Sequence, residues 1–185
     1  MKVIPTALKG VVLIQPRVFA DSRGYFMETW HQGKYRDNGI DISFSQTNLS
    51  RSTAGVLRGL HYQWPQPQAK LVQVLQGSVF DVAVDIRPGS PNYLKWVGVE
   101  LSAQNHHQLF IPEGFAHGFI TLSDTALLAY ACSREYSPEA DASIAWNDPQ
   151  IAIDWPIKPT SLSDKDTEAP KISDLQLANL PEFYG

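Results

Sequence analysis

The sequence contains a single cysteine and has no long apolar run. Cys132 cannot form an internal disulfide, and one thiol is too few for a thiolate metal site. The longest apolar stretches, such as residues 10–14 and 82–84, are far too short to span a bilayer. The N-terminus lacks the basic region and long apolar segment of a secretory signal. These features together predict a cytoplasmic protein that does not bind membranes.

Basic residues are outnumbered by acidic ones. The 185 residues include 15 Lys and Arg against 19 Asp and Glu, which gives a net charge of −4. This balance argues against a nucleic-acid partner, although an anionic ligand can still bind where basic residues converge locally. The 43% hydrophobic content excludes a disordered chain, and the length predicts a single domain over residues 1–185.

Aromatic residues are abundant, and most apolar residues alternate with a period of two. Aromatic and β-branched side chains are typical of strands, and the glycines and prolines divide the chain into short segments. We therefore predict an all-β fold, a sandwich or barrel, with a mostly irregular tail from about residue 149. Short helical segments are expected at 32–38 and 171–179. The predicted strands are 10–15, 24–31, 42–50, 56–63, 70–76, 79–87, 93–101, 107–111, 116–122 and 126–134.

The strand at 79–87 carries Asp81 and Asp85 on one face. If Gly77 and Ser78 formed a two-residue hairpin turn, Lys70 would lie opposite Asp85. Such a pair on a solvated face would contribute less than about 1 kcal/mol. Alternatively, this face is the polar interior of a barrel that binds a ligand. The pattern of this strand leaves both interpretations open.

Two histidine segments resemble the signature segments of the cupin jelly roll. They are Gly59-x-His61 and the Pro-x-Gly-x-x-His spacing that ends at His117. Many cupins bind a metal through His-x-His and a downstream Glu, but here Gln63 replaces the second His and no acidic residue occurs at 64–76. Two neutral imidazoles without a carboxylate are a poor site for iron or manganese, so we expect no metal.

A closer resemblance covers nearly the whole chain. It is carried, in chain order, by the blocks 21–28, 46–50, 56–63, 70–74, 80–87, 111–119, Tyr130, 136–138 and 163–166. These blocks are similar to those of the dTDP-sugar isomerase family, and one departure is Asp141, where the family more often has Glu. The resemblance implies a cupin-type jelly-roll barrel.

The resemblance implies a cofactor-independent epimerase that acts on a dTDP-linked 4-keto-6-deoxyhexose in rhamnose synthesis. The protons at C3 and C5 flank the C4 ketone, so each carbon can be inverted through an enolate. His61 matches the family's base, Asp166 the carboxylate that orients it, and Tyr130 the proton donor. Lys70 would supply positive charge at the C4 oxygen, with its amine fixed by Asp81 or Asp85. From the residues alone, His61 could instead be structural and Tyr130 a core aromatic.

The resemblance also implies a set of substrate-binding residues. Arg58 and His61 have opposite parity in a regular strand, so both face one ligand only if Gly59 marks a bulge or Arg58 reaches in from the rim. The implied binding residues are Arg23, Glu28, Gln46, Thr47, Asn48, Arg58, His117, Asp141 and Lys165.

A homodimer with strand exchange is a further implication of the resemblance. The segment 24–31 carries much apolar surface for an edge strand, including Phe26 and Trp30. We expect Arg23 and Glu28 to reach the site of the neighbouring subunit.

Three rival functions remain open at this point. A related enzyme could invert only C3 or only C5 of a similar sugar. A metal-dependent cupin enzyme would contain stoichiometric metal. A sugar- or nucleotide-binding module would catalyse no proton exchange.

Overall fold

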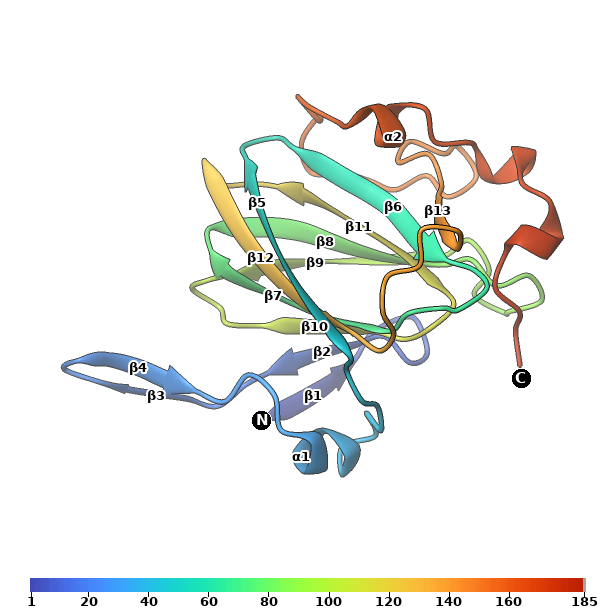
Figure 1. Cartoon of the computed structure of the whole chain (residues 1–185). Coiled ribbons are helices and arrows are strands. Elements are labelled where there is room, and N and C mark those ends of the chain that lie inside the picture. The colour runs from blue at the N-terminus through green and yellow to red at the C-terminus, as the bar shows by residue number, and fades with distance from the viewer. Residues whose placement is uncertain (185) are drawn as a thin grey trace.

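The computed structural model describes residues 1–184, which form two antiparallel sheets that face each other (Figure 1). The six-stranded sheet has the order β1-β2-β10-β7-β12-β5, and the five-stranded sheet has the order β13-β6-β11-β8-β9. The predicted all-β jelly-roll fold is confirmed. The first sheet contains β1 Lys2–Pro5, β2 Val12–Gln15, β10 Gln108–Ile111, β7 Lys70–Gln76, β12 Thr125–Cys132 and β5 Gln46–Thr53. The second contains β13 Asp141–Ser143, β6 Leu57–Gln63, β11 Phe115–Thr121, β8 Ser78–Asp85 and β9 Trp96–Ser102.

The core lies between the sheets because alternate residues of each strand point inward. Val72 and Leu128 of the first sheet pack in one buried cluster with Ala83 and Phe119 of the second. Asp81 lies on the same face of β8 as Ala83 and is fully buried. The solvated-face interpretation of this strand is therefore wrong, because the face points into the space between the sheets. Asp81 and Asp85 do not line the pocket described below, so the expected ligand contact of this face stays a prediction.

The predicted hairpin between strands β7 and β8 is also wrong. β7 pairs with β10 and β12, whereas β8 pairs with β11 and β9, so the short turn at Gly77 carries the chain from one sheet to the other. Lys70 consequently lies opposite Cys132 and Ile111 rather than opposite Asp85.

The C-terminal segment covers the outer face of the five-stranded sheet. Val82 and Ile86 on this face pack with Ile151, Ile172 and Leu180 of the tail. The tail contains helix α2 Asp164–Thr167 and two 3₁₀ turns, at Ile172–Asp174 and Leu177–Asn179, where we expected one helix over 171–179.

A hairpin arm projects away from the body of the molecule (Figure 1). It consists of β3 Val18–Asp21 and β4 Gly24–Met27, and it is followed by the short helix α1 Gln32–Arg36. Phe19 and Phe26 of the arm are largely exposed. None of the helices within residues 1–184 is long and apolar enough to cross a membrane.

Candidate active site

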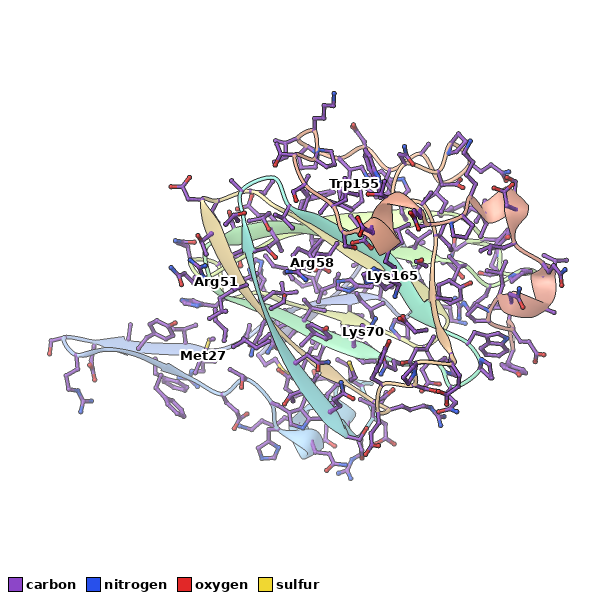
Figure 2. The ribbon with its side chains drawn as sticks, turned by 45° about the horizontal axis from the view of Figure 1, so that its top comes forward. Met27, Arg51, Arg58, Lys70, Trp155 and Lys165 are labelled. Carbon is purple, nitrogen blue, oxygen red and sulfur yellow. The ribbon has the colours of Figure 1, made fainter. Side chains whose placement is uncertain are left out.

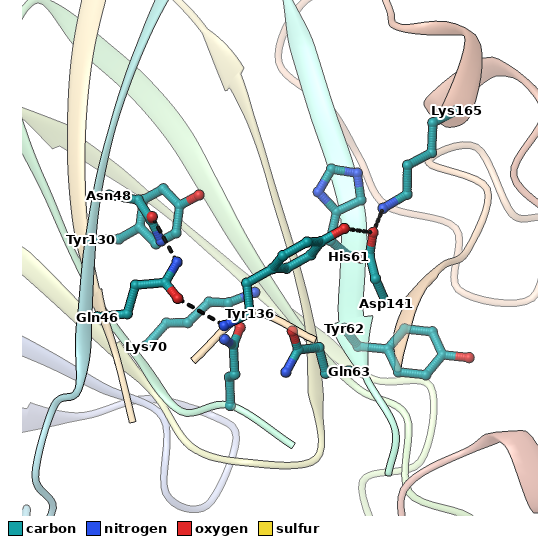
Figure 3. Close-up of a pocket in the computed structure, with 11 residues that line it drawn as sticks. Gln46, Asn48, His61, Tyr62, Gln63, Lys70, Tyr130, Tyr136, Asp141 and Lys165 are labelled. Carbon is teal, nitrogen blue, oxygen red and sulfur yellow. Dashed lines mark hydrogen bonds and ion pairs between the residues drawn. The ribbon is translucent and has the colours of Figure 1, made fainter. Parts of the chain in front are cut away.

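A pocket of about 340 Å³ lies between the two sheets and opens at the edge where β5 and β6 face each other. Its walls come from both sheets and are completed by the segment after β12 and by α2 (Figure 3). The side chains that line it are Gln46, Asn48, His61, Tyr62, Gln63, Gln68, Lys70, Tyr130, Tyr136, Asp141 and Lys165. Most of these are polar, so the pocket suits a hydrophilic ligand.

A bulge in β6 brings His61 into this pocket. Arg58 pairs with Phe119 and His61 pairs with His117, so three steps along β6 match two along β11. Gly59 has φ +135°, and a Cβ there would lie 2.5 Å from the Gly118 Cα atom. Only glycine fits this close approach. Of the two alternatives left open by the opposite parity of Arg58 and His61, a bulge at Gly59 is therefore present.

His61 is paired with a buried carboxylate. Its Nε2 atom lies 2.6 Å from Asp166 Oδ1, while Asp166 Oδ2 accepts a hydrogen bond of 2.8 Å from the Ser163 hydroxyl. Burial acts to raise the pKa of Asp166, but the hydrogen bonds from His61 and Ser163 outweigh it and hold that pKa below its usual value. An ionised Asp166 accepts the Nε2 proton, which leaves the lone pair of a neutral His61 on Nδ1.

Tyr130 reaches the same pocket from the opposite sheet. It lies on β12, whereas His61 lies on β6. Burial raises the pKa of the Tyr130 phenol, so the group stays protonated at neutral pH. No hydrogen-bond partner of its hydroxyl occurs among the described residues.

Lys70 begins β7 and lines the same pocket. Burial lowers the pKa of its ammonium, and Cys132, Asp141 and Asp81 oppose this effect. Within residues 1–184 no carboxylate forms an ion pair with Lys70. The charge is therefore free to interact with a ligand.

The expectation that Asp85 fixes the Lys70 amine is wrong. Asp85 is fully buried, and its carboxylate accepts hydrogen bonds from Arg87 and Ser90. Asp81 lies within electrostatic range of Lys70, but its two oxygens lie 3.0 and 2.9 Å from His117 Nε2.

His117 lies behind the pocket rather than on its lining. Its side chain is 9% exposed and is paired with Asp81. His61 and His117 are thus neighbours across β6 and β11, but each has its Nε2 atom on a different carboxylate. No group of three His, Cys, Asp or Glu side chains within residues 1–184 is arranged to hold a metal ion.

Polar side chains form the rim of the pocket. Gln46 donates to Asn48 at 2.9 Å and accepts a hydrogen bond from the Tyr136 backbone at 2.7 Å. Lys165 Nζ and the Tyr136 hydroxyl both contact Asp141 Oδ2, at 2.5 and 3.0 Å (Figure 3). Four of the expected binding residues, Gln46, Asn48, Asp141 and Lys165, therefore lie together at this rim.

Arg58 lies in an adjoining groove. The groove also contains Arg51, His61 and Lys165, and Arg58 Nε donates to the Ser52 hydroxyl at 3.0 Å. In Figure 2, Arg58 and Lys70 lie between β5 and β6. Arg51, Arg58 and Lys70 form no ion pair with a carboxylate of residues 1–184, so their positive charges converge around the opening of an otherwise acidic protein, which is the condition for binding an anion.

Besides Arg58 and His117, three more of the expected binding residues do not line the pocket of this chain. Thr47 points to the other side of β5, because side chains alternate along a strand, and lines a separate groove with Trp30. Arg23 lies on the arm, where its side chain is 88% exposed and paired with Asp21. Glu28 follows the arm and is paired with Lys34.

Sequence reasoning assigned no site role to four residues of the pocket, namely Tyr62, Gln63, Gln68 and Tyr136. Tyr136 is part of a block that resembles the family, but no role was assigned to it. Gln63 was considered only as a substitute for a metal-binding His, yet it accepts a hydrogen bond from the Ser137 backbone and fixes the segment that carries Tyr136. The family block at 136–138 was the available signal.

Comparison with known proteins identifies the family. The model of the dTDP-sugar isomerase family, described as dTDP-4-dehydrorhamnose 3,5-epimerase, matches residues 5–174. The chain belongs to this family. The epimerase of Methanothermobacter thermautotrophicus is 50% identical over 88% of this chain and 90% of its own length. That of Escherichia coli K12 is 53% identical over 84% of this chain and 85% of its own.

Solved structures of the family have the same fold. The 3,5-epimerase of Legionella pneumophila, crystallised with dTDP-4-keto-L-rhamnose, has a TM-score of 0.97 and 48% identity, covering 100% of this chain and 99% of that one. A 3'-monoepimerase from Streptomyces bikiniensis in complex with dTDP-quinovose has a TM-score of 0.90 and 34% identity, covering 97% of this chain and 92% of that one. The family resemblance in the sequence is confirmed.

Proposed function

We propose that this chain converts dTDP-4-dehydro-6-deoxy-D-glucose to dTDP-4-dehydro-L-rhamnose by inverting C3 and C5. The observation that carries the proposal is the joint presence of His61, Tyr130 and Lys70 in one pocket, with the two rings on opposite sheets. The substrate follows from the family, because the relatives that the chain resembles are named 3,5-epimerases and one was crystallised with dTDP-4-keto-L-rhamnose.

The chemistry requires a base, an acid and a positive charge. His61 removes the proton from C3 or C5, and Asp166 keeps its imidazole oriented and stabilises the imidazolium that forms. The Lys70 ammonium stabilises negative charge on the C4 oxygen of the enolate. Tyr130 delivers a proton from the opposite face, which inverts the carbon, and its phenol regains a proton from solvent. No metal or cofactor is needed for these steps.

The nucleotide is held by polar and basic groups around the opening. Arg58 supplies a guanidinium for the diphosphate, and Gln46 and Asn48 supply neutral hydrogen-bonding groups. His117 does not contact the ligand in this proposal. It lies opposite His61 on the neighbouring strand β11 and supports His61 from behind the pocket.

A homodimer completes the site in this proposal. The arm projects from the body and carries Arg23, while Glu28 follows it, so in a dimer with strand exchange these two residues extend to the partner's nucleotide. The exposed Phe19 and Phe26 supply apolar surface for such an interface. We place the protein in the cytoplasm because its only cysteine is a free, buried thiol.

Proton exchange in heavy water tests the proposed function. Incubation of the protein with dTDP-4-dehydro-6-deoxy-D-glucose in D₂O is expected to label both C3 and C5, as read by proton NMR and mass spectrometry. Label at one carbon only would make the chain a single-centre epimerase. No label would show a binding module, and activity that is lost on metal removal would show a metal-dependent cupin enzyme.

A further inference from the structure

Helix α2 contains no apolar residue. Its four residues are Asp164, Lys165, Asp166 and Thr167, and only Asp166 is buried. Hydrophobic burial therefore cannot decide where the helix lies. The chain is tied to the body on either side of α2, since Leu57 donates its backbone N–H to Ser161 and Ala145 donates to Pro170. Between these two ties, polar side-chain contacts fix the helix.

Two neighbouring side chains of α2 make these contacts in different directions. Asp166 accepts from His61 at 2.6 Å, and Lys165 donates to Asp141 at 2.5 Å. Successive residues of a helix are rotated by about 100°, which allows one side chain to reach β6 and the next to reach β13. The two strands are paired, with Ser143 of β13 opposite His61 and Asp141 opposite Gln63. Both contacts therefore anchor α2 to one rigid pair of strands.

The charges of Asp141 and Lys165 are already paired in the absence of a ligand. Lys165 and the Tyr136 hydroxyl converge on the same oxygen of Asp141, whose side chain is 19% exposed. A ligand at the rim meets a pair that is nearly neutral as a whole. This arrangement is better suited to holding parts of the protein together than to attracting a diphosphate.

We propose that Asp141 and Lys165 are positioning residues whose ion pair holds α2 in place, so that Asp166 stays on the imidazole of His61. This inference rests on the proposed function, in which His61 is the base. It differs from the expectation that the two residues act mainly by binding substrate. A loss of the ion pair is expected to loosen the His61–Asp166 hydrogen bond without emptying the pocket.

Kinetics separate positioning from substrate binding. Asp141→Asn and Lys165→Met are expected to lower kcat at least about tenfold, because small displacements of a catalytic group are costly. The Kd of dTDP, measured by calorimetry, is expected to change less than about twofold. Asp141→Glu and Lys165→Arg keep the charges and are expected to recover most of the rate. An unchanged kcat with weakened dTDP binding would overturn the proposal.

A double-mutant cycle with Asp166 tests whether the pair acts through that residue. In an Asp166→Asn background, Asp141→Asn is expected to lower kcat no further, since the contact that it protects is already lost. If Asp141→Asn lowered kcat by the same factor in the Asp166→Asn background as in the wild type, the proposal would be overturned. The matched control is Asp37→Asn, which makes the same change in an exposed ion pair at the end of α1, away from α2 (Figure 1), and is expected to leave kcat unchanged.

A readout that does not depend on activity separates this inference from the proposed function. In protein labelled with ¹⁵N-histidine, the His61 Nε2 proton is expected to give a protected resonance that broadens or disappears in Asp141→Asn. If the wild type shows no proton exchange at C3 or C5 but this spectral change occurs, the proposed function is wrong and the positioning contact stands. If the exchange occurs and the resonance is unchanged in the variant, the positioning role is wrong.

Discussion

His61 Nε2 and Asp166 Oδ1 lie 2.6 Å apart, although 105 residues separate them in the chain. The carboxylate is 3% exposed, and the imidazole is 33% exposed toward the pocket. A buried acceptor behind a partly exposed ring fixes which nitrogen carries the proton and which one faces the pocket. The pairing makes His61 a directed base rather than a freely rotating side chain.

Replacement of this acceptor is expected to slow the reaction strongly. Asp166→Asn keeps the shape but removes the charge and allows the wrong imidazole tautomer, so kcat is expected to fall about 100-fold or more. Steady-state kinetics with the dTDP-linked ketosugar measure the change, and Asp37→Asn is the matched control. A kcat within about twofold of wild type would show that Asp166 does not orient the base.

Lys70 presents a trade-off between activity and stability. Burial lowers the pKa of its ammonium, so the folded state binds that proton less tightly than the unfolded state does. Lys70→Met retains the length of the side chain and removes the charge. We expect kcat/KM to fall about 100- to 1000-fold, as for the loss of a group that stabilises an oxyanion.

The same substitution is expected to raise the Tm at pH 7, since no buried charge remains. Enzyme kinetics and thermal unfolding of one preparation measure both effects. A variant with wild-type kcat/KM would remove Lys70 from the mechanism, and a lowered Tm would contradict the stated effect of burial.

Asp85 links stability to pH. Burial acts to raise the pKa of its carboxyl, but hydrogen bonds from Arg87 and Ser90 outweigh it and hold that pKa below the unfolded value of about 3.9. Its stabilising effect is therefore present above about pH 4 to 5 and is lost as the pH falls through the folded pKa. At pH 7, Asp85→Asn is expected to lower the free energy of unfolding by about 2 to 3 kcal/mol.

Urea unfolding at a series of pH values checks this prediction. The free energies of unfolding of wild type and Asp85→Asn are expected to converge between about pH 5 and pH 2, because the wild type loses the contribution of the carboxylate there. A difference that stays constant over this range would show that the ionised form of Asp85 is not what stabilises the fold.

Position 59, in the bulge of β6, is expected to accept no residue other than glycine. Gly59→Ala adds a Cβ atom 2.5 Å from the Gly118 Cα atom at a φ of +135°, so we expect a loss of about 3 kcal/mol of stability and displacement of His61. Gly39→Ala is the control, because Gly39 also has positive φ but has open space around it. If the two variants lost equal stability, the close approach of β6 and β11 would not matter.

Much of the fold could be predicted from the sequence because alternating patterns report strands directly. The positions of β6, β7, β8 and β12 were close to those observed. The pairing of strands was not predictable in the same way. A turn at Gly77 is compatible with a hairpin and with a crossing between sheets, and only the packing of the two sheets decides between them.

The site was predicted in its centre and less well at its edges. His61, Lys70 and Tyr130 were placed in one pocket by the family blocks, and the contact between His61 and Asp166 was expected. Thr47 was included as part of the family block 46–50, although strand alternation turns it away from the pocket. Asp85 was assigned to Lys70 through the incorrect hairpin. The pair of Asp141 and Lys165 depends on how the tail folds back, which no local pattern encodes.

Deuterium incorporation by two variants tests the central claim most directly, namely that His61 and Tyr130 act as base and acid from opposite walls of one pocket. With the dTDP-linked ketosugar in D₂O, His61→Ala is expected to incorporate no deuterium at C3 or C5. Tyr130→Phe is expected to retain some exchange while formation of inverted product falls about 100-fold or more. Wild-type exchange in His61→Ala, or wild-type inversion in Tyr130→Phe, would contradict the account.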